Sequence, residues 1–299
     1  MLNGMFAFCI WDHTINTTYL VRDHMGIKPL YIYEDDEVLI FASEIKAILN
    51  VPGVDLSLDV RGFQDYLTFR YIQAPYTLFK NIYRLPAGSY IEFTKLKSNM
   101  HKYWDVCYNP DNTISINVFK EEILNTLNTV IKSQLMGEVP IGTLLSGGID
   151  SSIISYFIHN NNTHLKTFNI GYPEVNEFEF SREVAVAFKL DHAEIRTTSD
   201  SFIQNFHKIA MHLDEPIADP ACFPLFVLCE ELKKHVTVVL SGEGGDELFA
   251  GYPQYTKTLK EQNNSKPNFS SHLLNSKYYL NFNLFLRDNT DTSLIERYK

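Results

Sequence analysis

Hydrophobic positions follow two different patterns along this chain of 299 residues. Up to about residue 94, short apolar and aromatic runs alternate with polar turns, a pattern typical of antiparallel strands. From residue 140 onward, unbroken apolar runs alternate with stretches of helical spacing, which predicts a parallel, doubly wound sheet with helices on both faces. The pattern therefore predicts an α+β part followed by an α/β part.

The first part is expected to form a small antiparallel domain over residues 1–94. Its strands are expected over residues 5–11, 18–22, 30–33, 38–42 and 89–93. The first two should pair across the polar turn of residues 12–17. Ser43 is expected to cap a short helix that ends at Leu49, and a second helix is predicted over residues 60–68.

The second part is assigned to residues 115–299. The polar residues 95–114, which include Pro110, are the best candidate for a linker before it. Residues 116–136 have the strongest helical pattern in the chain. Further strands are expected over residues 141–145, 165–170, 193–196 and 236–240, and further helices over residues 153–158, 178–190, 202–213 and 224–234. The expected core face of helix 178–190 consists of Phe180, Val184, Ala187 and Phe188.

A glycine-rich turn, Ser146-Gly147-Gly148-Ile149-Asp150-Ser151-Ser152, follows the strand of residues 141–145. Gly147 and Gly148 let backbone amides approach an anion, and the first turn of the next helix supplies free N–H groups and the positive end of its dipole. The three serines add hydroxyl donors. Asp150 would repel a bare phosphate, so its carboxylate suggests that Mg²⁺ accompanies the anion. The turn lacks the spacing of a Walker A loop or a nucleophile elbow, and a plain serine-capped turn is the alternative.

A second glycine-rich segment, Ser241-Gly242-Glu243-Gly244-Gly245-Asp246-Glu247, follows the strand of residues 236–240. An acidic helix start would explain Asp246 and Glu247. It would not explain three glycines, which favour close ligand approach or unusual backbone angles. Ligands of doubly wound sheets lie beyond the carboxyl ends of strands, and both glycine-rich segments are expected there.

Composition narrows the class of protein. The chain is 45% hydrophobic, which is enough apolar content for a large core. Its net charge of −10 makes it a poor match to nucleic acid, which is itself negatively charged. It has no apolar run long enough to span a membrane and no signal peptide, so we expect a cytoplasmic protein. The four cysteines are scattered and are expected to be reduced and buried, without a structural metal.

Several segments together are similar to one family. Residues 2–8, 22–31, 41–47 and 82–88 look like the later part of a class II glutamine amidotransferase domain, which has an antiparallel N-terminal-nucleophile fold. Residues 146–152 are similar to the pyrophosphate loop of ATP pyrophosphatases, which have a HUP-like fold. Residues 241–252 and, more weakly, the acidic loop of residues 214–220 complete a resemblance to glutamine-hydrolysing asparagine synthetases. Ala250 stands where that family usually has glycine, and the carboxylates of residues 214–220 could equally be solvated turn residues.

The resemblance implies an AMP-forming amide synthesis. Aspartate would attack the α-phosphate of ATP to give β-aspartyl-AMP and magnesium pyrophosphate, and ammonia or glutamine-derived nitrogen would then displace AMP to give asparagine. Residues 146–152 would hold the pyrophosphate, with Asp150 on Mg²⁺. The positions that would contact the nucleotide are Leu145, Ile170, Ser241 and Gly242, although sheet packing equally explains the first two.

Two carboxylates are expected to be catalytic by the same resemblance. Glu243 matches the residue near the acyl-adenylate, as a general base or as an orienting group. Asp246 would support magnesium or substrate. The family's glutaminase domain begins with a cysteine nucleophile at residue 1, which this chain does not have, and Cys9 inside an expected strand is no substitute. We therefore expect no use of glutamine by this chain alone.

The family also extends beyond both ends of this sequence, so we expect a piece of a longer enzyme. Three interpretations stay open on the sequence. The chain is an ATP-dependent ligase, active with ammonia, as a homodimer or with complementing fragments; it is a truncated product that catalyses nothing; or it amidates another carboxylate, such as a sugar acid, or closes a β-lactam ring.

Overall fold

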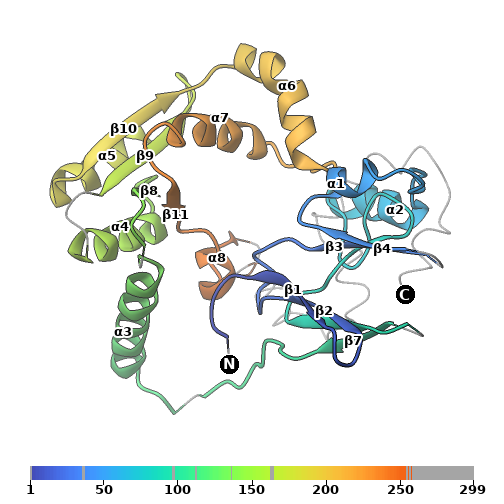
Figure 1. Ribbon diagram of the computed structural model, residues 1–299. Helices are drawn as coiled ribbons and strands as arrows, with labels where there is room; N and C mark the ends of the chain where they lie inside the picture. The colour runs from blue at the N-terminus through green and yellow to red at the C-terminus, as the bar shows by residue number, and fades with distance from the viewer. Residues whose placement is uncertain are drawn as a thin grey trace. The chain divides into compact units, whose positions relative to one another are not determined.

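The computed structural model describes residues 2–35, 38–95, 98–111, 113–135, 137–161, 165–253, 255 and 257 (Figure 1). The chain forms two compact units. The first contains residues Met1–Asp111 and Phe206–Asp219, and the second contains Asn112–Asn205 and Pro220–Lys299. None of the helices in the described part is long and apolar enough to cross a lipid bilayer.

The first unit contains two antiparallel sheets. One has the order β1-β2-β6-β7, with β1 (Ala7–Asp12), β2 (Thr17–Arg22), β6 (Ser89–Phe93) and β7 (Ser98–Lys102). The other has the order β4-β3-β5, with β3 (Tyr31–Glu34), β4 (Leu39–Ala42) and β5 (Ile82–Arg84). β1 and β2 pair with Asp12 opposite Thr17, so the predicted hairpin is confirmed.

β7 lies inside the segment that the sequence predicts to be a linker. It pairs with β6 along its whole length, with Met100 opposite Ile91, so residues 98–102 are a strand and not a linker. Most of its side chains are exposed because it is an edge strand with little packed on it. A polar edge strand has no apolar alternation, and it therefore resembles a linker in sequence.

Of the two short helices of the first unit, the first is capped differently from what the sequence predicts, and the second begins at Val60 as predicted. α1 (Ile45–Leu49) has Glu44 at its N-cap, without a side-chain capping bond, so the predicted Ser43 cap is wrong. The N–H of Ile45 instead donates to the Asp214 carboxylate at 2.7 Å, a partner 169 residues away that local sequence cannot reveal. α2 (Val60–Phe69) is capped by Asp59, whose side chain accepts from the N–H of Arg61.

The acidic loop after residue 213 is attached to the first unit by its first two carboxylates. Glu215 is 7% exposed, and its carboxylate accepts from the Arg84 guanidinium at 2.5 Å and from the N–H of Leu78 at 2.7 Å. Asp214 pairs with the Lys46 ammonium at 2.9 Å. Burial raises the pKa of Glu215, although the Arg84 charge opposes the shift. Asp214 and Glu215 hold the start of the loop in place, so they are not solvated turn residues, whereas Asp219 is exposed.

The second unit is a parallel sheet with the order β10-β9-β8-β11. Its strands are β8 (Ile141–Leu144), β9 (Lys166–Gly171), β10 (Asp191–Arg196) and β11 (Val238–Leu240). Its helices are α3 (Ile116–Gln134), α4 (Ile149–Asn161), α5 (Phe178–Phe188), α7 (Cys222–Leu232) and α8 (Gly245–Phe249), while α6 (Ser199–Leu213) has residues in both units. The predicted order of strands and helices is confirmed.

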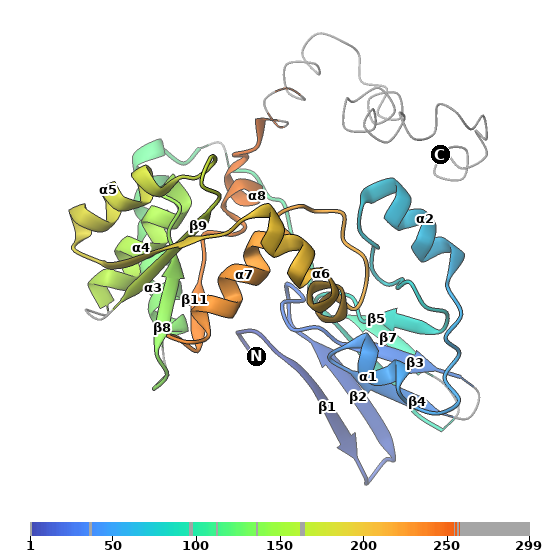
Figure 2. The same cartoon turned by 90° about the horizontal axis from the view of Figure 1, so that it is seen from above.

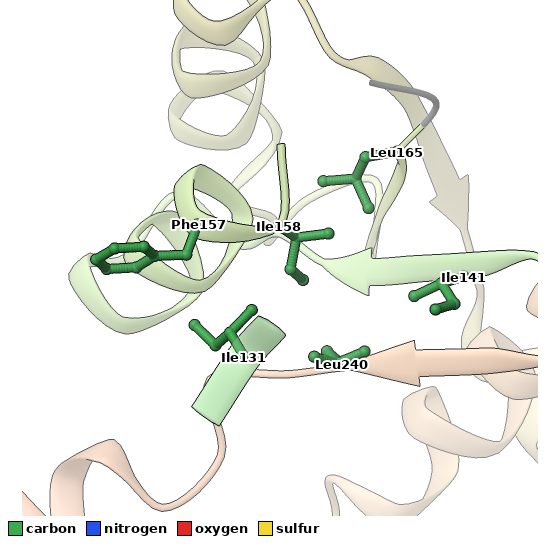
Figure 3. Close-up of a cluster of buried hydrophobic side chains, with 6 residues drawn as sticks. All are labelled: Ile131, Ile141, Phe157, Ile158, Leu165 and Leu240. Atoms are coloured by element: carbon green, nitrogen blue, oxygen red, sulfur yellow. The ribbon is translucent and has the colours of Figure 1, made fainter. Parts of the chain in front are cut away.

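Apolar clusters cover both faces of this sheet, as the doubly wound prediction requires. On one face, α3 and α4 pack on β8 and β11 through Ile131, Ile141, Phe157, Ile158, Leu165 and Leu240 (Figure 3). On the other, α7 packs on β9 through Phe168, Leu228 and Leu232. Figure 2 shows α4 and α5 on one side of the strands and α7 on the other. Each fully buried side chain of this size stabilises the fold by about 1.5 to 3 kcal/mol.

The predicted core face of α5 is wrong in part, since Val184 and Phe188 are partly buried but Phe180 and Ala187 are not. The helix buries Phe178, Ser181 and Ala185, whereas Phe180 is 59% exposed and Ala187 is exposed as well. The buried face contains a serine because polar side chains of β9 and β10 reach it by hydrogen bonds. Counting apolar residues therefore places two exposed residues on the core face of this helix.

The prediction of buried thiols is also wrong. Cys9, Cys107 and Cys229 are exposed and Cys222 is partly buried, and all four are free. Cys9 lies on β1, the edge strand of its sheet, where packing covers it only in part.

Candidate nucleotide site

The strand order creates a switch point between β8 and β11. From β8 the chain moves outward through β9 to β10, and it then returns to the other side of β8 for β11. The loops that leave β8 and β11 therefore diverge and open a crevice beyond the carboxyl ends of these strands. The Thr143 hydroxyl donates to the Leu240 carbonyl at 3.0 Å and ties the two strands together just before their loops.

The turn after β8 is held by its own serines. The Ser146 and Ser151 hydroxyl oxygens are 3.0 Å apart, and the Gly148 N–H donates to Ser146 Oγ at 3.2 Å. The N–H of Ser152 donates to the Gly148 carbonyl at 3.0 Å, which starts the hydrogen bonds of α4. The other first-turn N–H groups of a helix have no partner within it, and those of α4 therefore face the turn with the positive end of the dipole.

Gly147 is required by packing beneath the turn. Its φ is +91°, and a Cβ there would lie 2.5 Å from the carbonyl carbon of Phe180 and 2.6 Å from the nitrogen of Ser181. Because the start of α5 supports the turn directly, no side chain fits at this position. Gly147 therefore shapes the turn and does not line the cavity described below.

The second glycine segment lies against the first. A Cβ on Gly242 would lie 2.8 Å from the nitrogen of Ser151, and one on Gly245 would lie 2.6 Å from Cγ of Asp150. Two of the three glycines in this segment thus let the two loops approach closely around the Asp150 carboxylate. The third, Gly244, has a φ of +93° and open space around it.

Both loops line one cavity of about 460 Å³ within the second unit. Ten of the predicted site residues border it: Leu145, Ser146, Gly148, Asp150, Ser151, Ile170, Ser241, Gly242, Glu243 and Asp246. Gly147 and Ser152 do not. The Ser152 hydroxyl is instead buried without a hydrogen-bond partner.

Sequence reasoning misses an apolar wall and two further polar groups of this cavity. The wall is formed by Leu144, Phe168, Ala221, Pro224, Leu225 and Leu228. These residues are ordinary core types, and only the packing of α7 on β9 reveals where they lie. Asn169 also borders the cavity, as does Tyr252, whose hydroxyl donates to the Glu247 carboxylate at 2.9 Å.

The Tyr252 hydroxyl and the Glu247 carboxylate form a hydrogen-bonded pair at the acidic side of the cavity. The hydrogen bond to the Glu247 carboxylate, with smaller effects of partial burial and neighbouring charges, raises the pKa of Tyr252 to about 12. Tyr252 therefore remains a neutral donor that orients Glu247. Both residues occur in the motif of residues 241–252, so the motif carried a signal for them.

The donor set fits Mg²⁺ bound together with phosphate. Asp150 and Asp246 offer carboxylate oxygens at the cavity, and Mg²⁺ commonly takes one or two protein carboxylates and completes its shell with substrate phosphates and water. In the described part of the chain, no three His, Cys, Asp or Glu side chains are grouped closely enough to hold a metal by themselves. The site therefore suits a metal that arrives with its anion.

Comparison with known proteins now identifies the family. A parallel sheet with two glycine-rich loops at its switch point defines a doubly wound α/β protein with its ligand site at that edge. The model of the asparagine synthase family matches residues 122–297, and that of the glutamine amidotransferase domain matches residues 1–104. The chain therefore belongs to the asparagine synthase family, and the resemblance seen in the sequence is confirmed.

Two bacterial relatives show the extent of the match. The glutamine-hydrolyzing asparagine synthetase 1 of Bacillus subtilis is 35% identical over 263 residues, which cover 86% of this chain and 41% of that protein. The glutamine-hydrolyzing asparagine synthetase B of Escherichia coli is 30% identical over 277 residues, which cover 86% of this chain and 44% of that protein. The chain thus spans less than half the length of either relative.

Among solved structures, the glutamine-dependent NAD⁺ synthetase from Acinetobacter baumannii in complex with ADP is 16% identical with a TM-score of 0.35. The match covers 83% of this chain and 61% of that one. A score this low adds nothing to the fold assignment, which rests on the strand order.

Proposed function

We propose that the second unit binds Mg·ATP and activates the side-chain carboxylate of aspartate as an acyl-adenylate, which ammonia converts to asparagine. One observation carries this proposal: the glycine-rich loops after β8 and β11 meet around Asp150 and line a single cavity. Family membership and the names of the relatives supply the reaction.

In this proposal the turn of residues 146–151 holds the leaving pyrophosphate. The carboxylate oxygen of aspartate forms a bond to the α-phosphorus of ATP as the bond to the β-phosphate oxygen breaks. Negative charge grows on the departing pyrophosphate, where the α4 N-terminus and the Ser146 and Ser151 hydroxyls stabilise it. Mg²⁺ would neutralise part of this charge from Asp150, with Asp246 as the second carboxylate.

Amide formation follows at the acyl carbon. Ammonia attacks this carbon, the bond to the AMP oxygen breaks, and the nitrogen must lose one proton. Glu243 is exposed at the cavity on a segment flanked by glycines, and we assign it the role of accepting that proton or orienting the acyl group. Holding the reactants together supplies the rest of the rate enhancement.

Product analysis tests the proposal. The 299-residue chain is incubated with Mg·ATP, aspartate and ammonium, and AMP, pyrophosphate and asparagine are expected in equal amounts. Release of ADP and phosphate instead would contradict the AMP-forming route. Turnover with a different carboxylic acid in place of aspartate would keep the route and change the substrate, whereas no turnover with any acid or nitrogen donor would favour a catalytically inactive chain.

A further inference from the structure

The glycine turn after β8 lies directly on the first residues of α5. A Cβ on Gly147 would lie 2.5 Å from both the carbonyl carbon and the Cβ of Phe180, and 2.6 Å from the nitrogen of Ser181. The serine hydrogen bonds within the turn fix its shape. Its position over the sheet is set by α5, because Gly147 has no side chain that could separate the turn from the helix.

A single hydroxyl group attaches this part of α5 to two strands of the sheet. Ser181 is fully buried, and its oxygen lies 3.0 Å from the Asn169 amide nitrogen on β9 and 3.1 Å from His192 Nε2 on β10. The Phe178 carbonyl on α5 lies 3.2 Å from the same oxygen. On the other side of the imidazole ring, His192 Nδ1 lies 2.9 Å from Oγ1 of the fully buried Thr167. Ser181 is therefore the point at which hydrogen bonds join α5, β9 and β10.

The donors and acceptors of this network match in either form of the neutral imidazole ring. If Nε2 carries the proton, it donates to Ser181, and the serine hydroxyl donates to the Phe178 carbonyl. If Nδ1 carries it, the ring donates to Thr167 and accepts from Ser181. Asn169 donates to Ser181 in both forms. Removing this hydroxyl would leave the buried amide and the imidazole without their common partner, which is costly.

Hydrogen bonds restrain this contact more narrowly than apolar packing does. They weaken steeply outside a short range of distance and angle, whereas the burial of apolar surface has no preferred direction. At the start of α5, Phe178 is buried but Phe180 is 59% exposed, so apolar burial at this end comes from one ring. The hydrogen bonds of Ser181 therefore determine where the helix supports Gly147.

We propose that Ser181, through its hydrogen bonds to Asn169 and His192, positions the turn of residues 146–151 for pyrophosphate. The inference rests on the proposed function, because it requires that this turn holds pyrophosphate. Ser181 is not among the described residues that line the cavity, so it is a positioning residue that acts through Gly147. Donors that stand in place before the ligand arrives bind it without a cost of reorganisation, and a turn that shifts on α5 would lose this advantage.

Calorimetric binding of magnesium pyrophosphate and of AMP to the full chain tests this. Magnesium pyrophosphate reports on the turn, whereas AMP reports on the rest of the cavity. In Ser181→Ala, the affinity for magnesium pyrophosphate is expected to fall by about fivefold or more, and the affinity for AMP should stay within about twofold. Thr197→Val is the matched control. It removes a buried hydroxyl that has no hydrogen-bond partner among the described residues, so both affinities should be unchanged.

Two substitutions of His192 separate positioning from a general loss of structure. The amide nitrogen of a glutamine reaches about as far as Nε2 and can still donate to Ser181, whereas that of an asparagine corresponds to Nδ1 and reaches only Thr167. His192→Gln should therefore bind magnesium pyrophosphate within about twofold of the unaltered chain. His192→Asn should bind it about fivefold more weakly, as Ser181→Ala does.

The two ligands and the two positions make the outcomes distinct. An equal loss of affinity for pyrophosphate and for AMP in Ser181→Ala would overturn the proposal and leave Ser181 a structural role. Unchanged pyrophosphate binding in this variant would overturn it as well. If Ser181→Ala does not fold, the two variants of His192 decide, and equal pyrophosphate affinities in them would overturn the proposal. If the unaltered chain binds no magnesium pyrophosphate, the proposed function itself fails, and this inference fails with it.

Discussion

At the scale of residues, some positions around the cavity determine its shape and others are placed to take part in the reaction. Gly147, Gly242 and Gly245 shape it, because a Cβ at each would meet backbone or carboxylate atoms within 3 Å. Glu243 is different, since it is exposed at the cavity and its side chain is not needed for packing. Replacing a glycine should therefore impair binding, and replacing Glu243 should impair chemistry.

Glu243→Gln tests whether this side chain contributes to the chemical step. The amide keeps the size of the side chain but cannot accept the proton that ammonia loses, so asparagine formation should fall by about 100-fold or more while Mg·ATP still binds. Steady-state amide formation and equilibrium ATP binding are measured on the same preparation. Glu231→Gln, on α7 and away from the cavity lining, is the matched control. Unchanged turnover in Glu243→Gln would remove this residue from the mechanism.

At the scale of elements, α8 ends in an unfavourable conformation. Ala250 is its C-cap and has a φ of +55°, in the left-handed region that costs a residue with a Cβ roughly 1 kcal/mol. Ala250→Gly should therefore raise the free energy of unfolding by about 0.5 to 1 kcal/mol, as measured by urea denaturation. Ala47→Gly, inside α1, should lower it by a similar amount. A loss of stability in Ala250→Gly would show that the Ala250 methyl group contributes packing.

The contact between α5 and β10 should be sensitive to pH. Burial lowers the pKa of His192 below its ordinary value of 6.5. As the pH falls through 6.5, the unfolded chain takes up a proton that the folded chain resists, so stability is full above this value and is lost below it. Urea denaturation at about pH 7.5 and about pH 5.5 should show a larger loss for the unaltered chain than for His192→Gln.

The exposed His13 provides the control for this measurement. His13→Gln should retain the pH dependence of the unaltered chain. Equal losses in His192→Gln and in the unaltered chain would mean that other groups cause the change.

The elements that sequence predicts correctly are those whose signal is local. Both glycine-rich turns and the strands before them can be predicted from the sequence, because each apolar run is followed directly by its glycines. The cap of α1 by Asp214 and the hydrogen-bonded Ser181 face of α5 depend on partners from distant parts of the chain. Asn169 and the apolar wall were missed for the same reason, since only the packing of α5 and α7 brings them to the cavity.

At the scale of the whole molecule, residues from far along the chain complete the first unit. Residues Phe206–Asp219 belong to it, and the ion pair of the partly buried Arg84 with the buried Glu215 attaches them to the rest of the unit. Arg84→Met leaves the Glu215 carboxylate buried without its charged partner and should destabilise this unit by about 3 to 5 kcal/mol in urea denaturation. Arg84→Met combined with Glu215→Gln should recover part of this loss.

An exposed ion pair provides the comparison. Lys234→Met removes the pair with Glu231, and it should cost less than about 1 kcal/mol. A loss in Arg84→Met no larger than the loss in Lys234→Met would contradict the role assigned to the Arg84–Glu215 pair.

The proposed reaction requires that the loops after β8 and β11 form a single Mg·ATP site. Calorimetric titration of Mg·ATP into the full chain and into Gly245→Ala and Gly137→Ala tests it most directly. The added Cβ at residue 245 would press on the Asp150 carboxylate, whereas a Cβ at residue 137 meets nothing within 4 Å. We predict saturable binding that weakens at least about tenfold in Gly245→Ala and stays unchanged in Gly137→Ala. Equal affinity in all three proteins, or no binding by the unaltered chain, would contradict the claim.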